Sequence, residues 1–378
     1  MNYSIQEGLP LIPEGFHIHP NDWKWLCNST NSSLQQWCNY SHLFPVDMHL
    51  EEKLLMYQIV AILVPVIFSL TVIIGLVGNV LVVLVVVKNK CMINTTNILI
   101  LNLALADLMF LIFCVPFTAT DYALPSWPFG DLWCKVVQYI IHVTAYSSVY
   151  TLVLLAVDRY FAIVRPISSI GIRTKTNTVT IIFITWFLIL SLCLPLVLVF
   201  GQYPHLYVYG QSLVCRFMVE KGIAKVIYQV IFTVTGYFIP LFVICGFYFF
   251  VLKEVWGKTL HNARRRRHNV TRMLVIVIFV FACCWGPIHI ILLLKGLDVV
   301  DVTNTLLGIQ ISAQVLAYMN SCMNPILYAF FSENFRTAFK GLLPFYTPPQ
   351  DAANDVTTFP GTNSTRRTTL HVDAESAL

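Results

Sequence analysis

Seven long apolar segments separated by short polar stretches constrain this chain more than any other feature of its sequence. An α-helix needs about 20 mainly apolar residues to cross the hydrocarbon core of a bilayer. Of the 378 residues, 57% are hydrophobic and only 11% are charged, whereas soluble domains carry about 25% charged residues. The sequence therefore predicts an all-α membrane protein, a bundle of seven transmembrane helices. The predicted spans are residues 54–87, 97–119, 132–164, 178–200, 223–252, 270–294 and 305–331.

Basic residues concentrate in alternate gaps between these spans. Lys88 and Lys90 follow the first span, Arg165 and Arg173 the third, and four arginines at 264–267 the fifth. Loops rich in Lys and Arg stay in the cytoplasm. We therefore expect a multi-pass protein of the plasma membrane with an extracellular N-terminus and a cytoplasmic C-terminus. The same alternation argues against nucleic acid as a partner, because that would favour one continuous basic face.

The arm before the first span carries acceptor triplets for N-glycosylation, which only an extracellular or lumenal segment can use. These triplets begin at Asn2, Asn28, Asn31 and Asn39. Similar triplets also occur on the predicted cytoplasmic side, so they do not decide the orientation alone. No cleaved secretory signal is visible, because the first fifty residues lack an apolar stretch behind a basic start.

Four of the eleven cysteines fall at predicted extracellular positions, where disulfides persist. They are Cys27, Cys38, Cys134 and Cys215. Two bridges are possible, one within the arm and one between the third span and the loop before the fifth.

Polar side chains inside the spans are candidate functional residues, because ionisable groups are costly in a membrane. Asp107 stands out, since it lies mid-span with no basic partner nearby in sequence. A lone polar residue usually joins helices by hydrogen bonds. A cluster that includes a carboxylate predicts instead a hydrated pocket for a small cation such as sodium, with oxygen ligands. The other candidate ligands are Ser148, Asn320, Ser321 and Asn324.

Other motifs place charges, prolines and aromatic rings together. Asp158-Arg159-Tyr160 ends the third span, where an Arg can extend toward water and an adjacent Asp can hold it. Proline inside a helix removes a backbone hydrogen bond and kinks the helix, so the sixth and seventh spans are predicted to be movable parts. Their key residues are Phe281, Trp285, Pro287, Asn324, Pro325 and Tyr328.

Taken together, these motifs resemble those of the rhodopsin-like G-protein-coupled receptors across all seven spans. The resemblance also rests on Gly78-Asn79, Leu103 to Asp107, Trp186, Pro240, Tyr248 and Cys284 to Pro287. Within that family, residues 292–304, 317–339 and 270–273 are similar to the insect allatostatin-A receptors, whose vertebrate relatives are the galanin receptors. This implies a receptor rather than an enzyme, with a short neuropeptide ligand ending in amidated Phe-Gly-Leu. It also implies signalling through heterotrimeric G proteins, commonly of the inhibitory type.

The resemblance assigns roles to single residues. It implies a disulfide between Cys134 and Cys215, and an outward swing of the sixth span at Pro287 that frees Arg159 for the G protein. Tyr248 and Tyr328 would then close behind Arg159. The expected peptide contacts are Gln138, Ile141, His289, Gln310 and Gln314, with Asp121 attracting a basic peptide at the rim.

Four regions follow from the spans and the resemblance: an arm (1–53), the bundle (54–331), an amphipathic helix on the inner membrane surface (332–343) and a polar tail (344–378). The tail composition predicts disorder, and its Ser and Thr residues suit receptor kinases and arrestin. Two features depart from the family pattern. The tail lacks the usual palmitoylated Cys, and no acid opens the sixth span, so Arg159 is expected to rest on Asp158 and Thr271.

Other ligands and functions fit less well. A retinal-binding opsin needs a lysine where Tyr318 stands, and an amine receptor needs an acid where Ile141 stands. Galanin-like or kisspeptin-like peptides remain the alternative ligands. A transporter or channel would need more charged residues or repeated halves, and an intramembrane enzyme would need paired aspartates or a metal motif.

Overall fold

The computed structural model describes residues 48–207, 210–218, 222–257, 261–300 and 303–341. The acceptor asparagines, Cys27, Cys38 and the tail beyond residue 341 lie outside these ranges, so the predictions made for them stay predictions. Contacts divide the chain into two compact units. Residues 61–203 and 213–378 form the larger unit, which holds the helix bundle, and residues 1–60 with 204–212 form the smaller one.

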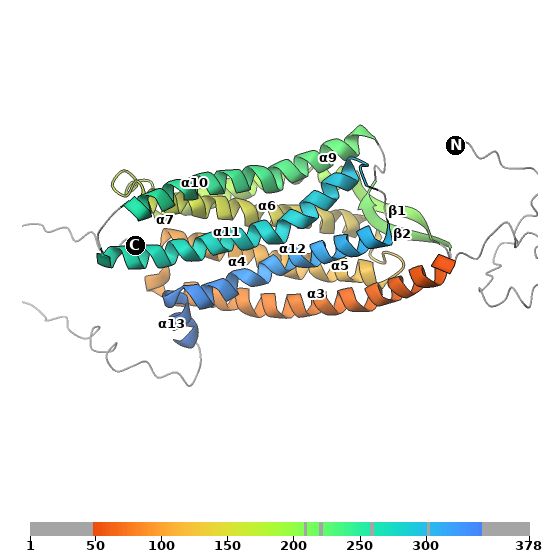
Figure 1. Cartoon of the computed structure of the whole chain (residues 1–378), viewed down its shortest axis with the longest axis horizontal. Coiled ribbons are helices and arrows are strands. Elements are labelled where there is room, and N and C mark those ends of the chain that lie inside the picture. The colour runs from red at the N-terminus through yellow and green to blue at the C-terminus, as the bar shows by residue number, and fades with distance from the viewer. Residues whose placement is uncertain (1–47, 208–209, 219–221, 258–260, 301–302, 342–378) are drawn as a thin grey trace, which may run out of the picture. The chain divides into compact units, whose positions relative to one another are not determined.

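The described residues are almost entirely helical, and the long helices lie side by side (Figure 1). The helices are α3 (Met48–Lys88), α4 (Thr95–Phe113), α5 (Val115–Ala123), α6 (Gly130–Ile163), α7 (Lys175–Cys193), α8 (Leu196–Val199), α9 (Ile223–Thr233), α10 (Ile239–Gly257), α11 (His261–Gly296), α12 (Asn304–Phe331) and α13 (Glu333–Gly341). A 3-10 turn covers Lys90–Met92, and a π-helical turn, Val234–Phe238, joins α9 to α10. Strands β1 (Phe200–Tyr207) and β2 (Gly210–Phe217) form a two-stranded sheet.

Six helical stretches among the described residues are long and apolar enough to cross a membrane. They are Gln58–Lys88, Thr95–Ala123, Gly130–Ile163, Lys175–Val199, Ile223–Trp256 and Val275–Gly296. The seventh predicted span is present as the 28-residue helix α12. Its lower hydropathy follows from polar side chains such as Gln314, Asn320 and Asn324, which a helix tolerates when they face its neighbours rather than lipid.

Side-chain caps explain where three of the helices begin. Asn94 accepts a hydrogen bond from the backbone N–H of Asn97 before α4, and Thr174 does the same for Asn177 before α7. Thr303 caps α12 in this way. Such caps satisfy backbone donors that the first helical turn leaves without partners. The sequence therefore determines the inner ends of α4 and α7 locally.

Prolines divide some spans and not others. The second span breaks at Cys114, two residues before Pro116, and the fourth breaks at Leu194 before Pro195. The π-helical turn ends at Phe238, two residues before Pro240. Such turns are often found at functional sites. By contrast, Pro287 and Pro325 lie inside α11 and α12 without ending them.

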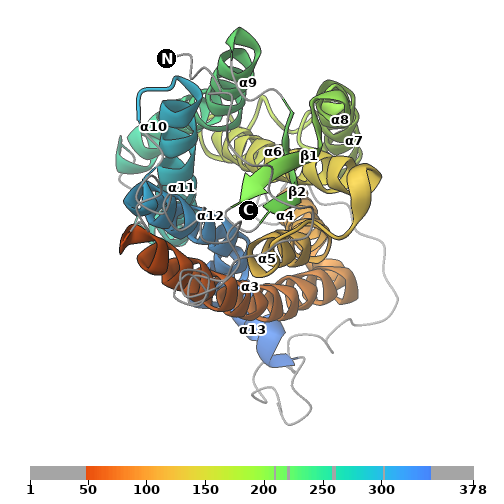
Figure 2. The same cartoon turned by 90° about the vertical axis from the view of Figure 1, so that its right-hand side faces the viewer.

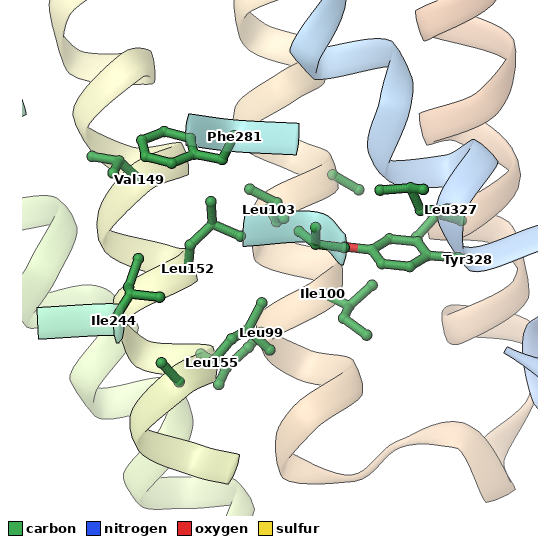
Figure 3. Close-up of a cluster of buried hydrophobic side chains, with 14 of the residues drawn as sticks. Leu99, Ile100, Leu103, Val149, Leu152, Leu155, Ile244, Phe281, Leu327 and Tyr328 are labelled. Atoms are coloured by element: carbon green, nitrogen blue, oxygen red, sulfur yellow. The ribbon is translucent and has the colours of Figure 1, made fainter. Parts of the chain in front are cut away.

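The core is built around α6, which packs against α4, α7 and α10, and Figure 2 shows these helices from the end of the bundle. Figure 3 shows the largest cluster, where side chains from α4, α6, α10, α11 and α12 meet. Its labelled members are Leu99, Ile100, Leu103, Val149, Leu152, Leu155, Ile244, Phe281, Leu327 and Tyr328. The buried cluster therefore ties together the helices that carry Asp107, Arg159, Tyr248, Trp285 and Tyr328.

Large apolar side chains also cover the outside of the bundle. Phe183 and Phe187 on α7 are each 70% exposed, and Phe242 on α10 is 81% exposed. Monomeric soluble proteins rarely show apolar patches of this extent. An outer surface of this kind suits contact with lipid chains, as the composition predicts.

We expect Leu103→Ala to lower the free energy of unfolding by about 2–5 kcal/mol, because Leu103 is 1% exposed and its truncation leaves a cavity in the core. Leu105→Ala is the matched control, since that side chain lies two residues away on the same helix and is 44% exposed. Thermal unfolding of both variants in the same detergent measures the difference. Equal losses would contradict the assignment of which face of α4 is buried.

Candidate functional site

The predicted cation pocket is assembled around Asp107, whose side chain is fully buried. Ser148 of α6 donates to one carboxylate oxygen at 3.0 Å, and Asn324 of α12 donates to the other at 2.9 Å. The side chains of Asn320 and Ser321 are also buried. The backbone carbonyl of Ser321 accepts a hydrogen bond from Asn79 of α3 at 2.9 Å. Three helices, α4, α6 and α12, therefore meet at this carboxylate, and Asn79 ties α3 to α12.

The oxygen atoms around Asp107 are suited to coordinate a small hard cation. A carboxylate, a hydroxyl and amide oxygens are the ligand types that such ions prefer. The side-chain oxygen of Asn79 is buried and has no hydrogen-bond partner among the described residues. One nearby oxygen is therefore still available as an acceptor. Among the described residues, no group of three or more His, Cys, Asp and Glu side chains forms a transition-metal site.

Near the C-terminal end of α6, Asp158 has partners that the sequence did not predict. Arg173, from the loop before α7, binds one carboxylate oxygen through its Nε at 2.9 Å. Thr96 donates to the other oxygen at 2.6 Å, and Thr95 donates to the first at 3.2 Å. Asp158 therefore has three partners outside its own helix.

Arg159 is expected from the sequence to rest on Asp158 and Thr271. It forms an ion pair with Asp158, with 3.9 Å between Nη2 and Oδ2, which is too long for a hydrogen bond. The Nε of Arg159 is buried without a partner among the described residues. The side chain of Thr271 lies outside the described residues. Arg173, and not Arg159, is thus the main basic partner of Asp158.

Aromatic rings lie at three further residues that were predicted to act in activation. Tyr160 packs edge-to-face on Phe247 of α10 at 5.3 Å between ring centroids. Tyr248 is buried in the main core cluster. Tyr328 is also buried, its hydroxyl has no hydrogen-bond partner among the described residues, and its ring stacks on Phe335 of α13 at 5.4 Å. These rings connect α6, α10, α12 and α13.

The outer half contains the predicted disulfide, and this prediction is confirmed. Cys134 of α6 and Cys215 of β2 are bonded, with 5.5 Å between their Cα atoms. Gln202 reinforces the same loop, because its backbone N–H donates to Asp131 at 2.9 Å and its side chain donates to the carbonyl of Trp127 at 3.1 Å. The loop is therefore fixed to the outer end of α6.

The predicted peptide contacts occupy different depths. Gln138 lies beside the disulfide, with its Nε2 3.8 Å from the sulfur of Cys215. Ile141 packs against the buried cluster that contains both cysteines of the disulfide. Gln314 accepts from Tyr122 at 2.7 Å and donates to Tyr318 at 3.1 Å. These residues come from α5, α6, β2 and α12.

The remaining predicted contacts have other partners or surroundings. Gln310 accepts from Lys295 at 2.6 Å, and Asp121 is exposed on α5. His289 is buried deeper, and its ring packs near Phe232 and Trp285 at 4.9 and 6.0 Å between centroids.

A small cavity lies beside His289, between α6, the π-helical turn and α11. It is lined by Ala145, Tyr146, Val149, Phe232, Gly236, Phe281, Trp285 and His289. The Nδ1 of His289 and the Nε1 of Trp285 are both buried without hydrogen-bond partners among the described residues. Unpaired buried polar groups are costly. The two nitrogens are therefore candidates to bind a polar group of a ligand, if one reaches them.

The structure adds residues that the sequence patterns did not single out. His142 is buried on α6, and its two ring nitrogens are 2.7 Å from the carbonyl of Gln138 and 2.6 Å from the hydroxyl of Tyr228. Phe200, Phe217 and Phe232 surround this pair. An ionisable residue within an apolar segment was the available signal, because such residues are rare in spans.

Comparison with known proteins agrees with this geometry. Residues 78–328 match the family model described as 7 transmembrane receptor (rhodopsin family). The chain belongs to this family. The match runs from Gly78, within the first span, to Tyr328 of α12, and so reaches all seven helical spans of the described residues.

Individual members of the receptor family are also similar over most of their length. The receptor is 49% identical to the allatostatin-A receptor of Bombyx mori over 317 residues, which cover 82% of this chain and 86% of the relative. It is 36% identical to the galanin-like G-protein coupled receptor npr-9 of Caenorhabditis elegans, over 74% and 73% of the two chains. It is 35% identical to human galanin receptor type 2, over 74% and 72%.

A double-mutant cycle tests the buried pair of His142 and Tyr228. His142→Leu or Tyr228→Phe alone should each cost about 1–3 kcal/mol of stability, because each leaves a buried polar partner unpaired or loses its hydrogen bond. The double variant should cost at least 1 kcal/mol less than the sum, because no partner is then left behind (about the coupling usual for contacting residues). Thermal unfolding in detergent gives the four values, and strict additivity would show that the two side chains do not interact.

Proposed function

We propose that this receptor binds a short neuropeptide of the allatostatin-A type, with an amidated Phe-Gly-Leu end, and activates heterotrimeric G proteins. The observation that carries the proposal is the 49% identity to an allatostatin-A receptor across 82% of the chain. The galanin receptors, at 35–37% identity, supply the alternative ligand class.

The chemistry of the outer half supports a peptide with a neutral amide end. The side chains that contact Gln314 are neutral and aromatic, namely Tyr122 and Tyr318. Ile141 stands where an amine ligand would need an acid. A carboxamide both donates and accepts hydrogen bonds, so it complements glutamine and tyrosine side chains without needing a countercharge.

The same proposal assigns an activation path. The peptide would bind the active arrangement more tightly than the inactive one, since only differential affinity can shift the equilibrium. The rings of His289 and Trp285 lie 6.0 Å apart between centroids, and Trp285 lies two residues before Pro287 in α11. A peptide pressing on His289 and Trp285 would move α11 about Pro287. Arg159 would then meet the G protein, with Tyr248 and Tyr328 closing behind it.

Further partners follow from the predicted topology. We infer a plasma-membrane protein with its N-terminus outside and its C-terminus inside, surrounded by membrane lipids. Inhibitory G proteins are the proposed transducers, and receptor kinases with arrestin are proposed to act on the tail. A sodium ion held by Asp107, Ser148 and Asn324 would favour the inactive arrangement, because it would bridge α4, α6 and α12.

Peptide challenge tests the ligand assignment. Cells that express the receptor should activate G proteins in response to an amidated Phe-Gly-Leu peptide. The concentration needed should be at least 100-fold lower (about 2.7 kcal/mol) than the concentration needed of the free-acid peptide, because the acid would place a charge among neutral groups. Galanin and kisspeptin are the comparison ligands. A response confined to either of them would contradict the allatostatin-A assignment and leave the receptor family unchanged.

Asp107→Asn tests the proposed sodium site. Sodium should weaken agonist binding to the wild-type receptor by severalfold relative to a large organic cation, and this effect should disappear in Asp107→Asn, which keeps the size of the side chain and removes its charge. Agonist competition binding in the two salts gives the ratio. Asp131→Asn is the control, since that carboxylate lies at the outer end of α6. A sodium effect that survives in Asp107→Asn would rule out this site.

A further inference from the structure

The loop between α6 and α7 is folded so that Arg173 points back into the bundle. Ser169 is buried and donates to the carbonyls of Phe161 and Pro166 at 3.1 and 3.0 Å. Its own carbonyl accepts from the backbone N–H of Arg173 at 2.8 Å. Thr174 then caps α7. The backbone on both sides of Arg173 is therefore fixed by hydrogen bonds, which positions its guanidinium.

Arg173 and Arg159 lie at the same carboxylate under unequal conditions. Arg173 reaches Asp158 at 2.9 Å and also donates to Thr95 at 3.2 Å. Arg159 comes no closer to Asp158 than 3.9 Å, and its Nε has no partner among the described residues. A hydrogen-bonded ionic contact is much stronger than a longer unaligned one. Asp158 is thus largely satisfied by groups other than Arg159.

The first turn of α4 adds to this arrangement. Thr95 and Thr96 both donate to Asp158, and they stand at the N-terminus of α4, where the helix dipole favours negative charge. Asp158 therefore keeps its charge stabilised by α4 and by Arg173 together. This leaves Arg159 as a buried cation whose nearest carboxylate is already engaged.

We propose that Arg173 is a positioning residue for G-protein coupling, which holds Asp158 away from Arg159 and so keeps Arg159 available to the transducer. Without Arg173, Asp158 would have Arg159 as its nearest guanidinium and would bind it more tightly. Arg159 would then have to break that contact before it met a G protein. The loop between α6 and α7 thereby sets how readily the receptor couples. The inference rests on the proposed coupling to G proteins.

The test compares purified receptor variants in lipid nanodiscs at a saturating concentration of the amidated Phe-Gly-Leu peptide. The probe is the nucleotide-free G-protein heterotrimer that the wild-type receptor binds best. Arg173→Ala should weaken its binding by about five- to tenfold (1.0–1.4 kcal/mol). Arg165→Ala is the matched control, because Arg165 is an exposed arginine of the same loop, and it should change binding less than twofold. Arg159→Ala should abolish binding.

A second substitution separates positioning from mere support of the loop. If Asp158 holds Arg159 in Arg173→Ala, then adding Asp158→Asn should restore binding to within twofold of Asp158→Asn alone, because the carboxylate that captures Arg159 is gone. A loop that is simply misfolded would not be repaired by that change. Unaltered binding in Arg173→Ala, or the absence of rescue, would overturn the proposal.

Chemical labelling gives a readout that needs no G protein. An arginine-selective dicarbonyl reagent followed by mass spectrometry should modify Arg159 at least threefold more slowly in Arg173→Ala than in wild type, and Asp158→Asn should reverse the change. Should wild type bind no heterotrimer, the proposed coupling fails, while the labelling still decides whether Arg173 controls Arg159. Equal labelling rates would reject the positioning role.

Discussion

Polar contacts between α4 and α6 are the interaction on which the rest of this structure depends. Asp158 pairs with Thr96 near one end, Thr151 with Asn102 in the middle, and Ser148 with Asp107 farther along. In a membrane, apolar surfaces gain little from leaving lipid, so hydrogen bonds and close packing must hold helices together. Three contacts at different depths fix the rotation and the axial register of the two helices.

Other helices are placed relative to this pair. Trp186 of α7 donates to Asn102 at 2.9 Å, and Asn324 of α12 donates to Asp107 at 2.9 Å. Both bonds therefore end on residues that also bind α6. The apolar cluster in Figure 3 fills the space between these contacts. The proposed cation pocket and the environment of Arg159 are thus parts of one framework, because both are built on the interface of α4 and α6.

Much of the fold could be predicted from the sequence, because apolar length and the positions of charges are local properties. The spans, the Cys134–Cys215 bridge and the cluster around Asp107 needed only helical periodicity and family motifs. The partner of Asp158 could not be found in this way. Arg173 is separated from it by a loop whose path depends on the hydrogen bonds of Ser169. The pairing of His142 with Tyr228 likewise depends on the rotation of α9 against α6.

The π-helical turn in the fifth span has a consequence for any bending of α11 at Pro287. Tyr237, within that turn, donates to the carbonyl of Ala282 at 3.0 Å. A Cβ atom on Gly286 would lie 2.8 Å from the Tyr237 hydroxyl, so glycine leaves room for this approach. The contact lies about one turn before Pro287, where α11 already lacks a backbone bond. A bend of α11 at Pro287 would therefore act directly on the hydrogen bond that joins α11 to the fifth span.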